Sequence, residues 1–195
     1  MMKNKGMIIT IAVIAVIAIW GILAHNGLVI AEENVNSQWA NVESQYQRRA
    51  DLIPNLVATV KGYASHESQT LENVVAARAR ATQVTVDAES LTPEKLQAYQ
   101  AAQGELTSAL GRLLMITENY PDLKANQNFQ ELQAQLEGTE NRIQVERSRY
   151  NEVAQIYNTT TRRFPGSVMA SLFGFDKKPY FEADKEAKQA PKVEF

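Results

Sequence analysis

The chain begins with an uninterrupted apolar segment. From Gly6 to Ala24 the sequence GMIITIAVIAVIAIWGILA contains no charged residue. A helix of this length rises roughly 28 Å at about 1.5 Å per residue, which is close to the thickness of the hydrocarbon core of a bilayer. The segment therefore predicts a transmembrane helix, and residues 1–31 are interpreted as a short cytoplasmic stub followed by this anchor.

The charges around the apolar segment predict how it is oriented. Lys3 and Lys5 precede it, Glu32 and Glu33 follow it, and the next basic residue is Arg48. Because basic residues are enriched on the cytoplasmic side of membrane helices, the N-terminus is expected in the cytoplasm and the rest of the chain outside it. This interpretation makes the chain a single-pass protein of the cell membrane.

A cleaved signal peptide is the alternative to a retained anchor. The residues from Val29 to Ala31 resemble a small-residue cleavage site. The apolar run is longer than the apolar part of an ordinary signal peptide. We therefore expect the anchor to be retained.

Residues 32–165 show the periodicity of amphipathic helices almost throughout. Apolar residues recur every three or four positions from Val35 to Tyr63, which predicts one long helix with a single apolar stripe. Arg49 occupies the one polar position in that stripe. Further helices are expected at about residues 67–84 and 93–119, and beyond Pro121.

The last of these helices carries the most regular pattern. Large apolar residues recur every seven positions, at Phe129, Leu136, Ile143, Tyr150, Tyr157 and Phe164. The second row of the repeat, three residues after each of these, is half polar, with Leu132 and Val153 but also Thr139, Glu146 and Thr160. This mixture is typical of a helix in a bundle rather than of an isolated coiled coil. No segment shows the alternation typical of strands. The predicted fold class is therefore all-α, with an antiparallel four-helix bundle over residues 32–165.

Pro54 stands inside the long first helix of this predicted bundle. A proline in a helix interior removes one hydrogen bond and costs about 3 kcal/mol. The apolar stripe nevertheless keeps its phase across Pro54, which predicts a kinked helix rather than a loop. Two roles remain open: a bend that follows the neighbouring helices, or a notch in which a freed carbonyl group and Arg48, Arg49 and Asp51 bind a partner. If Arg49 is buried, it needs a carboxylate or carbonyl partner.

Residues 166–195 form an apolar and then charged tail, which we expect to be irregular. An even number of antiparallel helices returns the chain to the end at which it left the membrane. The stretch SLFGF is therefore expected against the membrane-proximal end of the bundle. Contact with the membrane interface and a docking surface for another protein or another copy are the alternatives. The candidate interaction residues are Leu172, Phe173 and Phe175.

The inventory of reactive side chains is small. Cysteine is absent and the two histidines, His25 and His66, lie far apart in the sequence. No spacing matches a metal-binding Glu-x-x-His pair, a nucleophilic triad or a phosphate-binding glycine loop. The net charge of −2 gives no indication of nucleic-acid binding. No catalytic, cofactor-binding or metal-binding residue, cofactor or small-molecule substrate is therefore assigned.

Three stretches together resemble the LemA family of bacterial membrane proteins. They are NVNSQWANVESQYQRRADLIPNLVATVKGYASHES, NYPDLKANQNFQELQAQLEGTENRIQVERSRYNEVAQIYN and FPGSVMASLFGFDKKPYFEADKEAKQAPKVEF. The resemblance covers almost everything from Val35 to the C-terminus. Thr161 departs from it, because an apolar residue is expected there. The resemblance implies one N-terminal membrane helix and a four-helix extramembrane bundle, and it implies no established biochemical activity.

The leading hypothesis is a non-enzymatic, membrane-anchored scaffold of LemA type. Its expected partners are the lipid bilayer, an unidentified protein and, as an alternative, further copies of the chain. A sensory or signalling bundle that acts through helix shifts is the second hypothesis. It is weakened because only about six residues are expected on the cytoplasmic side. An enzyme is the third hypothesis, and it would require a deep polar pocket with clustered carboxylates of perturbed pKa.

Overall fold

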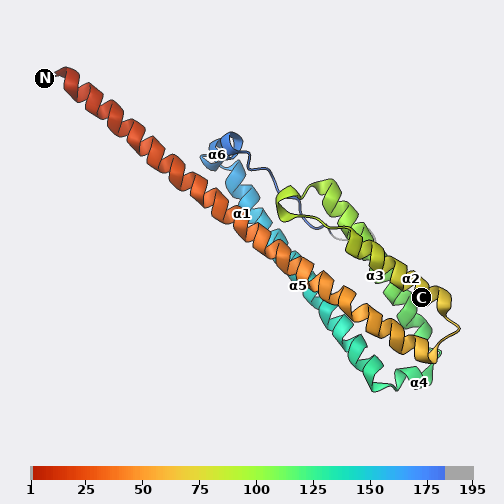
Figure 1. Ribbon diagram of the computed structural model, residues 1–195. Helices are drawn as coiled ribbons and strands as arrows, with labels where there is room; N and C mark the ends of the chain where they lie inside the picture. The colour runs from red at the N-terminus through yellow and green to blue at the C-terminus, as the bar shows by residue number, and fades with distance from the viewer. Residues whose placement is uncertain (1, 183–195) are drawn as a thin grey trace, which may run out of the picture.

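Helices and their connections make up the chain in a computed structural model that describes residues 2–182, with side chains from residue 6 onward (Figure 1). The elements are α1 (Met2–Tyr63), α2 (Ser68–Gln83), the short 3-10 helix η1 (Ala88–Ser90), α3 (Pro93–Thr117), α4 (Pro121–Lys124), α5 (Gln127–Arg162) and α6 (Gly166–Phe173). No strand occurs among the described residues, so the prediction of an all-helical chain is confirmed.

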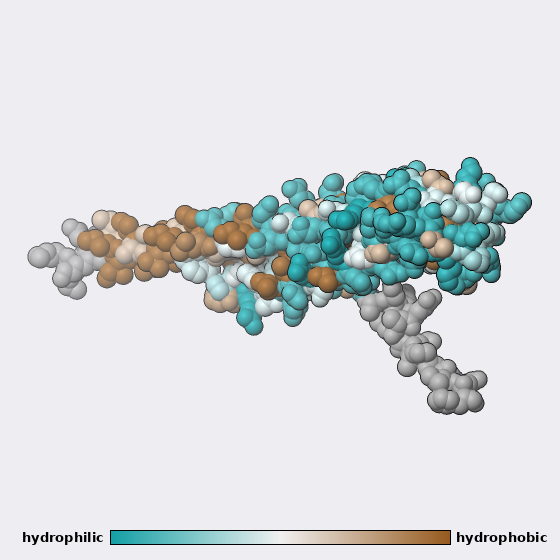
Figure 2. Space-filling model, turned by 90° about the horizontal axis from the view of Figure 1, so that it is seen from below, coloured by the Kyte–Doolittle hydropathy of each residue, from teal (hydrophilic) through white to brown (hydrophobic). Residues whose placement is uncertain are grey.

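The apolar segment and the first helix of the body are parts of one element. α1 continues without interruption for 62 residues, and the predicted boundary at residue 31 coincides with no break in it. Within the described residues it is the one helix long and apolar enough to cross a membrane. Figure 2 shows the N-terminal part of α1 as an apolar shaft and the body of the protein as a mostly hydrophilic surface.

The four long helices associate in two pairs. α1 lies beside α5, and α2 lies beside α3 and also packs on α1 (Figure 1). Near the middle of α5, the Gln38 Nε2 atom donates a hydrogen bond of 2.6 Å to Glu146 Oε2. Just before α5 begins, the Asn126 Nδ2 atom donates one of 2.9 Å to the Tyr63 hydroxyl. Polar contacts therefore join the pair from the start of α5 to its middle.

The interior contains two separate clusters of buried side chains. We call the first the aliphatic core; its main members are Ile53, Leu56, Val60, Leu71, Val74, Leu106, Leu113 and Leu136. The second, which we call the aromatic core, lies nearer the apolar segment Gly6–Ala24. It includes Val35, Trp39, Val42, Tyr46, Tyr99, Ile143, Tyr150, Tyr157 and Phe181. Each large side chain buried in them stabilises the fold by about 1.5–3 kcal/mol before entropy is considered.

The predicted apolar stripes are confirmed except at their ends. In α1, Tyr63 is 44% exposed and Ala64 is buried in its place. The seven-residue repeat of α5 is buried from Phe129 to Tyr157, but Phe164 is 83% exposed, so its predicted burial is wrong. The reason is that α5 ends at Arg162 and the next residue has extended backbone, which takes Phe164 out of the helical phase.

The tail differs from the irregular segment that was expected. Residues Gly166–Phe173 form α6, and Gly174 ends this helix with a left-handed backbone angle φ of 75°. The chain then turns back and runs along the body as far as residue 182 (Figure 1). We call residues 175–182 the C-terminal strap. The rest of the charged tail expected from the sequence, residues 183–195, lies outside the described residues.

Candidate functional site

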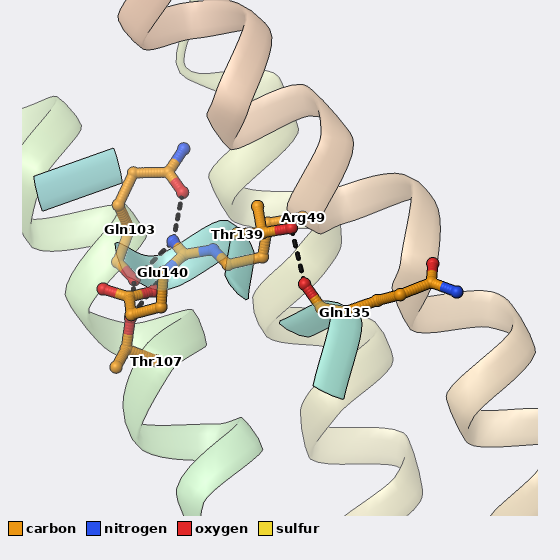
Figure 3. A network of polar contacts seen from close by, with 6 residues as sticks. All are labelled: Arg49, Gln103, Thr107, Gln135, Thr139 and Glu140. Carbon is orange, nitrogen blue, oxygen red and sulfur yellow. Dashed lines mark hydrogen bonds and ion pairs between the residues drawn. The ribbon is translucent and has the colours of Figure 1, made fainter. Parts of the chain in front are cut away.

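Arg49 is the centre of a buried polar network (Figure 3). Its side chain is almost completely buried, with 2% of the residue exposed. The Nη1 atom donates hydrogen bonds to Glu140 Oε2 at 2.7 Å and to Thr107 Oγ1 at 2.8 Å. The Nη2 atom donates to Gln103 Oε1 at 2.7 Å and to the Gln103 carbonyl at 3.3 Å. The prediction that a buried Arg49 has a carboxylate or carbonyl partner is therefore confirmed.

This network, which we call the Arg49 layer, joins all four long helices. Arg49 comes from α1, Gln103 and Thr107 from α3, and Glu140 from α5. The Gln103 Nε2 atom also donates a hydrogen bond of 3.3 Å to the carbonyl of Ala81 in α2. A buried polar group that must find specific partners can fix the register of neighbouring helices.

The Arg49 layer separates the two cores. On α1 the aromatic core ends at Tyr46 and the aliphatic core begins at Ile53, with Arg49 between them. On α3 the aromatic core gives way to the aliphatic core around Gln103. On α5 the boundary between the two cores lies just before Ile143. A sliding movement of one helix would bring apolar side chains opposite the guanidinium group, where its hydrogen bonds would be lost.

A polar hollow of about 440 Å³ opens beside the Arg49 layer. Its lining includes Arg49, Thr107, Glu140, Gln144 and Arg147. Glu140 lies between the Arg49 layer and this hollow, and 39% of its side chain is exposed. Among residues 6–182 there is no group of three or more His, Cys, Asp or Glu side chains arranged for a metal ion. The hollow is lined by hydrogen-bonding side chains and by the Arg49–Glu140 ion pair.

Three buried tyrosines of the aromatic core are harder to ionise than an exposed tyrosine. Burial raises the pKa of Tyr99 well above its ordinary value, and the nearby Tyr46 adds to the shift. Burial likewise raises the pKa of Tyr150 and of Tyr157. Their hydroxyl groups consequently stay protonated to a higher pH than that of an exposed tyrosine.

Pro54 lies in α1 on the exposed side of the helix, and α1 continues through it (Figure 1). A proline cannot donate a hydrogen bond to the carbonyl group four residues earlier, which here belongs to Ala50. That carbonyl accepts a hydrogen bond of 2.7 Å from Arg78 Nε of α2. The group freed by Pro54 is thus used to attach α2 to α1, while the predicted kink stays a prediction.

The three residues proposed for a notch near Pro54 point in different directions. Arg49 is directed into the Arg49 layer, whereas Arg48 and Asp51 are exposed at the surface. Asp51 Oδ1 accepts a hydrogen bond of 2.8 Å from Gln47 Nε2 on the same helix. The structure therefore does not bring Arg48, Arg49 and Asp51 together into one site.

The role of Arg78 can be tested with Pro54. Arg78→Met is expected to lower the free energy of unfolding by about 1 kcal/mol, because the buried Ala50 carbonyl loses its partner. In a Pro54→Ala background the same substitution should have a smaller effect, because the new N–H group can bond the Ala50 carbonyl. Urea denaturation followed by circular dichroism measures both values. Equal losses in the two backgrounds would contradict this account.

The candidates Leu172, Phe173 and Phe175 lie beside the end of the apolar segment. Met169 of α6 lies about 4.0 Å from the position that a β-carbon would occupy at Gly21. The ring centroids of Phe173 and Phe175 lie 4.6 Å and 5.6 Å from that of His25 in α1. Leu172 and Phe173 are largely exposed and Phe175 is half-buried. Of the three, Phe173 and Phe175 thus gather around His25.

Two asparagines of α5 hold the C-terminal strap by its backbone. Asn158 Nδ2 donates to the Lys178 carbonyl at 2.8 Å, and Asn158 Oδ1 accepts from the Lys178 N–H group at 2.9 Å. Asn151 makes the same pair of bonds with Phe181, at 2.9 Å each. Because they are seven residues apart, both asparagines lie on one face of α5. Each side-chain amide supplies the hydrogen-bond donor and acceptor that a neighbouring strand would otherwise give to an extended segment.

The side chains of the strap complete the aromatic core. The Phe181 ring stacks on Trp39 at an interplanar angle of 14°, and it meets Tyr150 edge-on. Lys178 is 5% exposed and its Nζ atom forms a 2.9 Å ion pair with Glu32 of α1. The strap therefore connects α5 to the part of α1 that emerges from the apolar segment. Sequence reasoning missed this segment, because the two asparagines that hold it are typical polar residues of a helix surface.

Comparison with known proteins assigns the chain to a family. The model of the LemA family matches residues 38–195, which include the Arg49 layer and the strap. The chain belongs to the LemA family. Apart from residues 34–37, the three stretches that resemble this family lie within the matched range. Thr161, which departs from the resemblance, is buried, and its hydroxyl donates to the Asn158 carbonyl at 3.1 Å.

Several curated proteins are similar to this chain. Magnetosome protein MamQ 2 of Paramagnetospirillum magneticum is 26% identical over 210 residues, which cover 96% of this chain and 77% of the relative. Magnetosome protein MamQ of Magnetospirillum gryphiswaldense is 26% identical over 187 residues, covering 87% and 68%. Protein LemA of Metamycoplasma hominis is 22% identical over 160 residues, covering 82% and 69%.

Proposed function

We propose that this LemA-family chain is a non-enzymatic, membrane-anchored scaffold. It presents a rigid helical body to protein partners at the extracytoplasmic surface of the cell membrane. The observation that carries the proposal is α1, in which the apolar segment and the first helix of the body form one uninterrupted helix. A helix held in the bilayer at one end positions everything packed against its other end.

The body is proposed to be an antiparallel four-helix bundle made of α1, α2, α3 and α5. Support comes from two hydrogen-bonded pairs: Tyr63, at the end of α1, bonds to Asn126 just before α5, and the earlier Gln38 bonds to Glu146, farther along α5. The Arg49 layer adds rigidity, because one guanidinium group makes hydrogen bonds to α3 and α5 at the same level. Such a body suits a protein that offers a constant surface to a partner.

The outward surface of the body favours transient or polar contacts with a partner. It is mostly hydrophilic in Figure 2, while the large apolar side chains of α1 from Val35 to Val60 are turned inward. The expected partners are therefore proteins that recognise exposed polar helix faces, and they include further copies of this chain. Crosslinking of the membrane-embedded protein followed by affinity capture identifies them.

Anchoring and orientation are tested together on spheroplasts of cells that express the chain with an N-terminal epitope. The full-length protein should resist extraction with alkaline carbonate, because its apolar segment spans the bilayer. External protease should digest the body and leave the epitope protected. Extraction into the carbonate supernatant would refute the anchor, and a protected body would refute the orientation. A periplasmic soluble protein and a cytoplasmic protein serve as controls for protease access.

A further inference from the structure

α6 lies at a depth that the apolar segment determines. Its Met169 side chain contacts α1 at Gly21, inside the segment Gly6–Ala24 that is predicted to span the bilayer. One turn later, His25 of α1 packs against Phe173. A helix that touches α1 at these positions cannot be far from the boundary between the hydrocarbon region and the head groups.

The composition of this region is unlike that of a surface helix in water. The twelve residues from Phe164 to Phe175, FPGSVMASLFGF, contain no charged residue. Arg162 and Arg163 precede them, and Asp176, Lys177 and Lys178 follow them directly. An uncharged segment bounded by charges on both sides is typical of a short stretch that leaves water and returns to it.

Large apolar side chains of this segment are exposed. The exposed fractions are 83% for Phe164, 43% for Val168, 68% for Leu172 and 59% for Phe173. The other side of α6 is already occupied, because Ala170 is buried and the helix packs on α1 and α5. Phe173 touches His25 on one side, and all four side chains nevertheless keep much of their surface open within the described residues.

We propose that α6 is an interfacial helix that inserts the exposed side chains of Phe164, Val168, Leu172 and Phe173 into the membrane leaflet facing the body. The proposal rests on the anchoring of α1 proposed above and adds a second lipid contact to it. Helices of this kind lie roughly 5–10 Å deep, at the boundary of head groups and acyl chains. The bilayer is favoured over a second protein because α6 packs on the spanning segment itself.

The absence of cysteine makes a direct measurement possible. Three single-cysteine variants of the full-length chain are labelled with an environment-sensitive fluorophore: Leu172→Cys in α6, Ile14→Cys in the apolar segment, and Met115→Cys in α3. All three positions are exposed, at 68%, 61% and 71%, so labelling should not disturb the fold. Each variant is placed in nanodiscs at one chain per disc, with and without phosphatidylcholine carrying a spin-label quencher near the head group or near the end of the acyl chain.

The expected result distinguishes the two membrane contacts. The label at Leu172 should be quenched several-fold more by the shallow quencher than by the deep one, and the label at Ile14 should respond to the deep quencher. The label at Met115 should respond to neither. If Ile14 is quenched but Leu172 behaves like Met115, the interfacial helix is refuted and the anchor stands. Blue-shifted but unquenched emission at Leu172 would show protein contact and would also refute it. Without quenching at Ile14, both proposals fail.

Discussion

Glu140→Ala is expected to lower the free energy of unfolding by about 2–3 kcal/mol. The substitution leaves the guanidinium group of Arg49, which is 2% exposed, with neutral partners alone. Breaking a fully buried ion pair typically costs about 3–5 kcal/mol. The expected loss is smaller because 39% of the Glu140 side chain is exposed and water can partly replace it. Denaturant unfolding of the full chain in detergent, followed by circular dichroism, measures the change.

A surface ion pair in the same protein provides the matched control. Arg80 Nε and Glu105 Oε2 are 2.9 Å apart, and both side chains are 57% exposed. Glu105→Ala should therefore change stability by less than about 0.5 kcal/mol. Adding Arg49→Met to Glu140→Ala should recover part of the loss, because it removes the stranded charge. Similar small losses for Glu140→Ala and Glu105→Ala would show that the Arg49 layer contributes no more than an exposed pair.

Phe181→Ala is expected to release the C-terminal strap and to lower the free energy of unfolding by about 3 kcal/mol or more. Phe181 is 6% exposed, and its ring packs between Trp39 and Tyr150. Truncating a buried phenylalanine removes its burial energy and leaves a cavity, at a cost of about 3–5 kcal/mol. Hydrogen exchange at residues 175–182 should accelerate, and the fluorescence of Trp39 should shift to the red as water enters.

Asn158→Ala tests the same docking through the backbone bonds. It should accelerate exchange in the strap, because the Lys178 N–H and carbonyl groups lose their buried partners while the aromatic rings stay intact. Ile156→Ala serves as the control, since Ile156 is also in α5 but is 63% exposed. If strap exchange stays unchanged in both the Phe181 and Asn158 variants, the strap is not an integral part of the aromatic core.

The helices of the body were predictable because their apolar spacing reports burial directly. The stripe of α1 and the repeat of α5 alternate with polar residues at the period of a helix, so the buried face follows from the sequence. Arg49 was predictable for a related reason, since a charge inside an apolar stripe has to find a partner. Its partners were not, because Gln103 and Glu140 come from other helices and their levels depend on how those helices slide together.

The tail was less predictable because its contacts are made over long sequence distances. Asn151 and Asn158 read as ordinary polar residues of a helix surface until an extended segment is placed beside them. Phe164 continued the seven-residue repeat in the sequence, but the end of α5 at Arg162 removed it from that pattern. The exposure of Leu172 and Phe173 likewise depends on where α6 docks, and no local pattern contains that information.

The continuity of α1 makes the protein a lever. With the apolar segment in the bilayer, the 39 residues from His25 to Tyr63 extend roughly 58 Å beyond it, at about 1.5 Å per residue. A tilt of about 20°, which is ordinary for a spanning helix, would swing the far tip sideways by roughly 20 Å. Small changes in bilayer thickness would thereby become large displacements of whatever is attached at the tip.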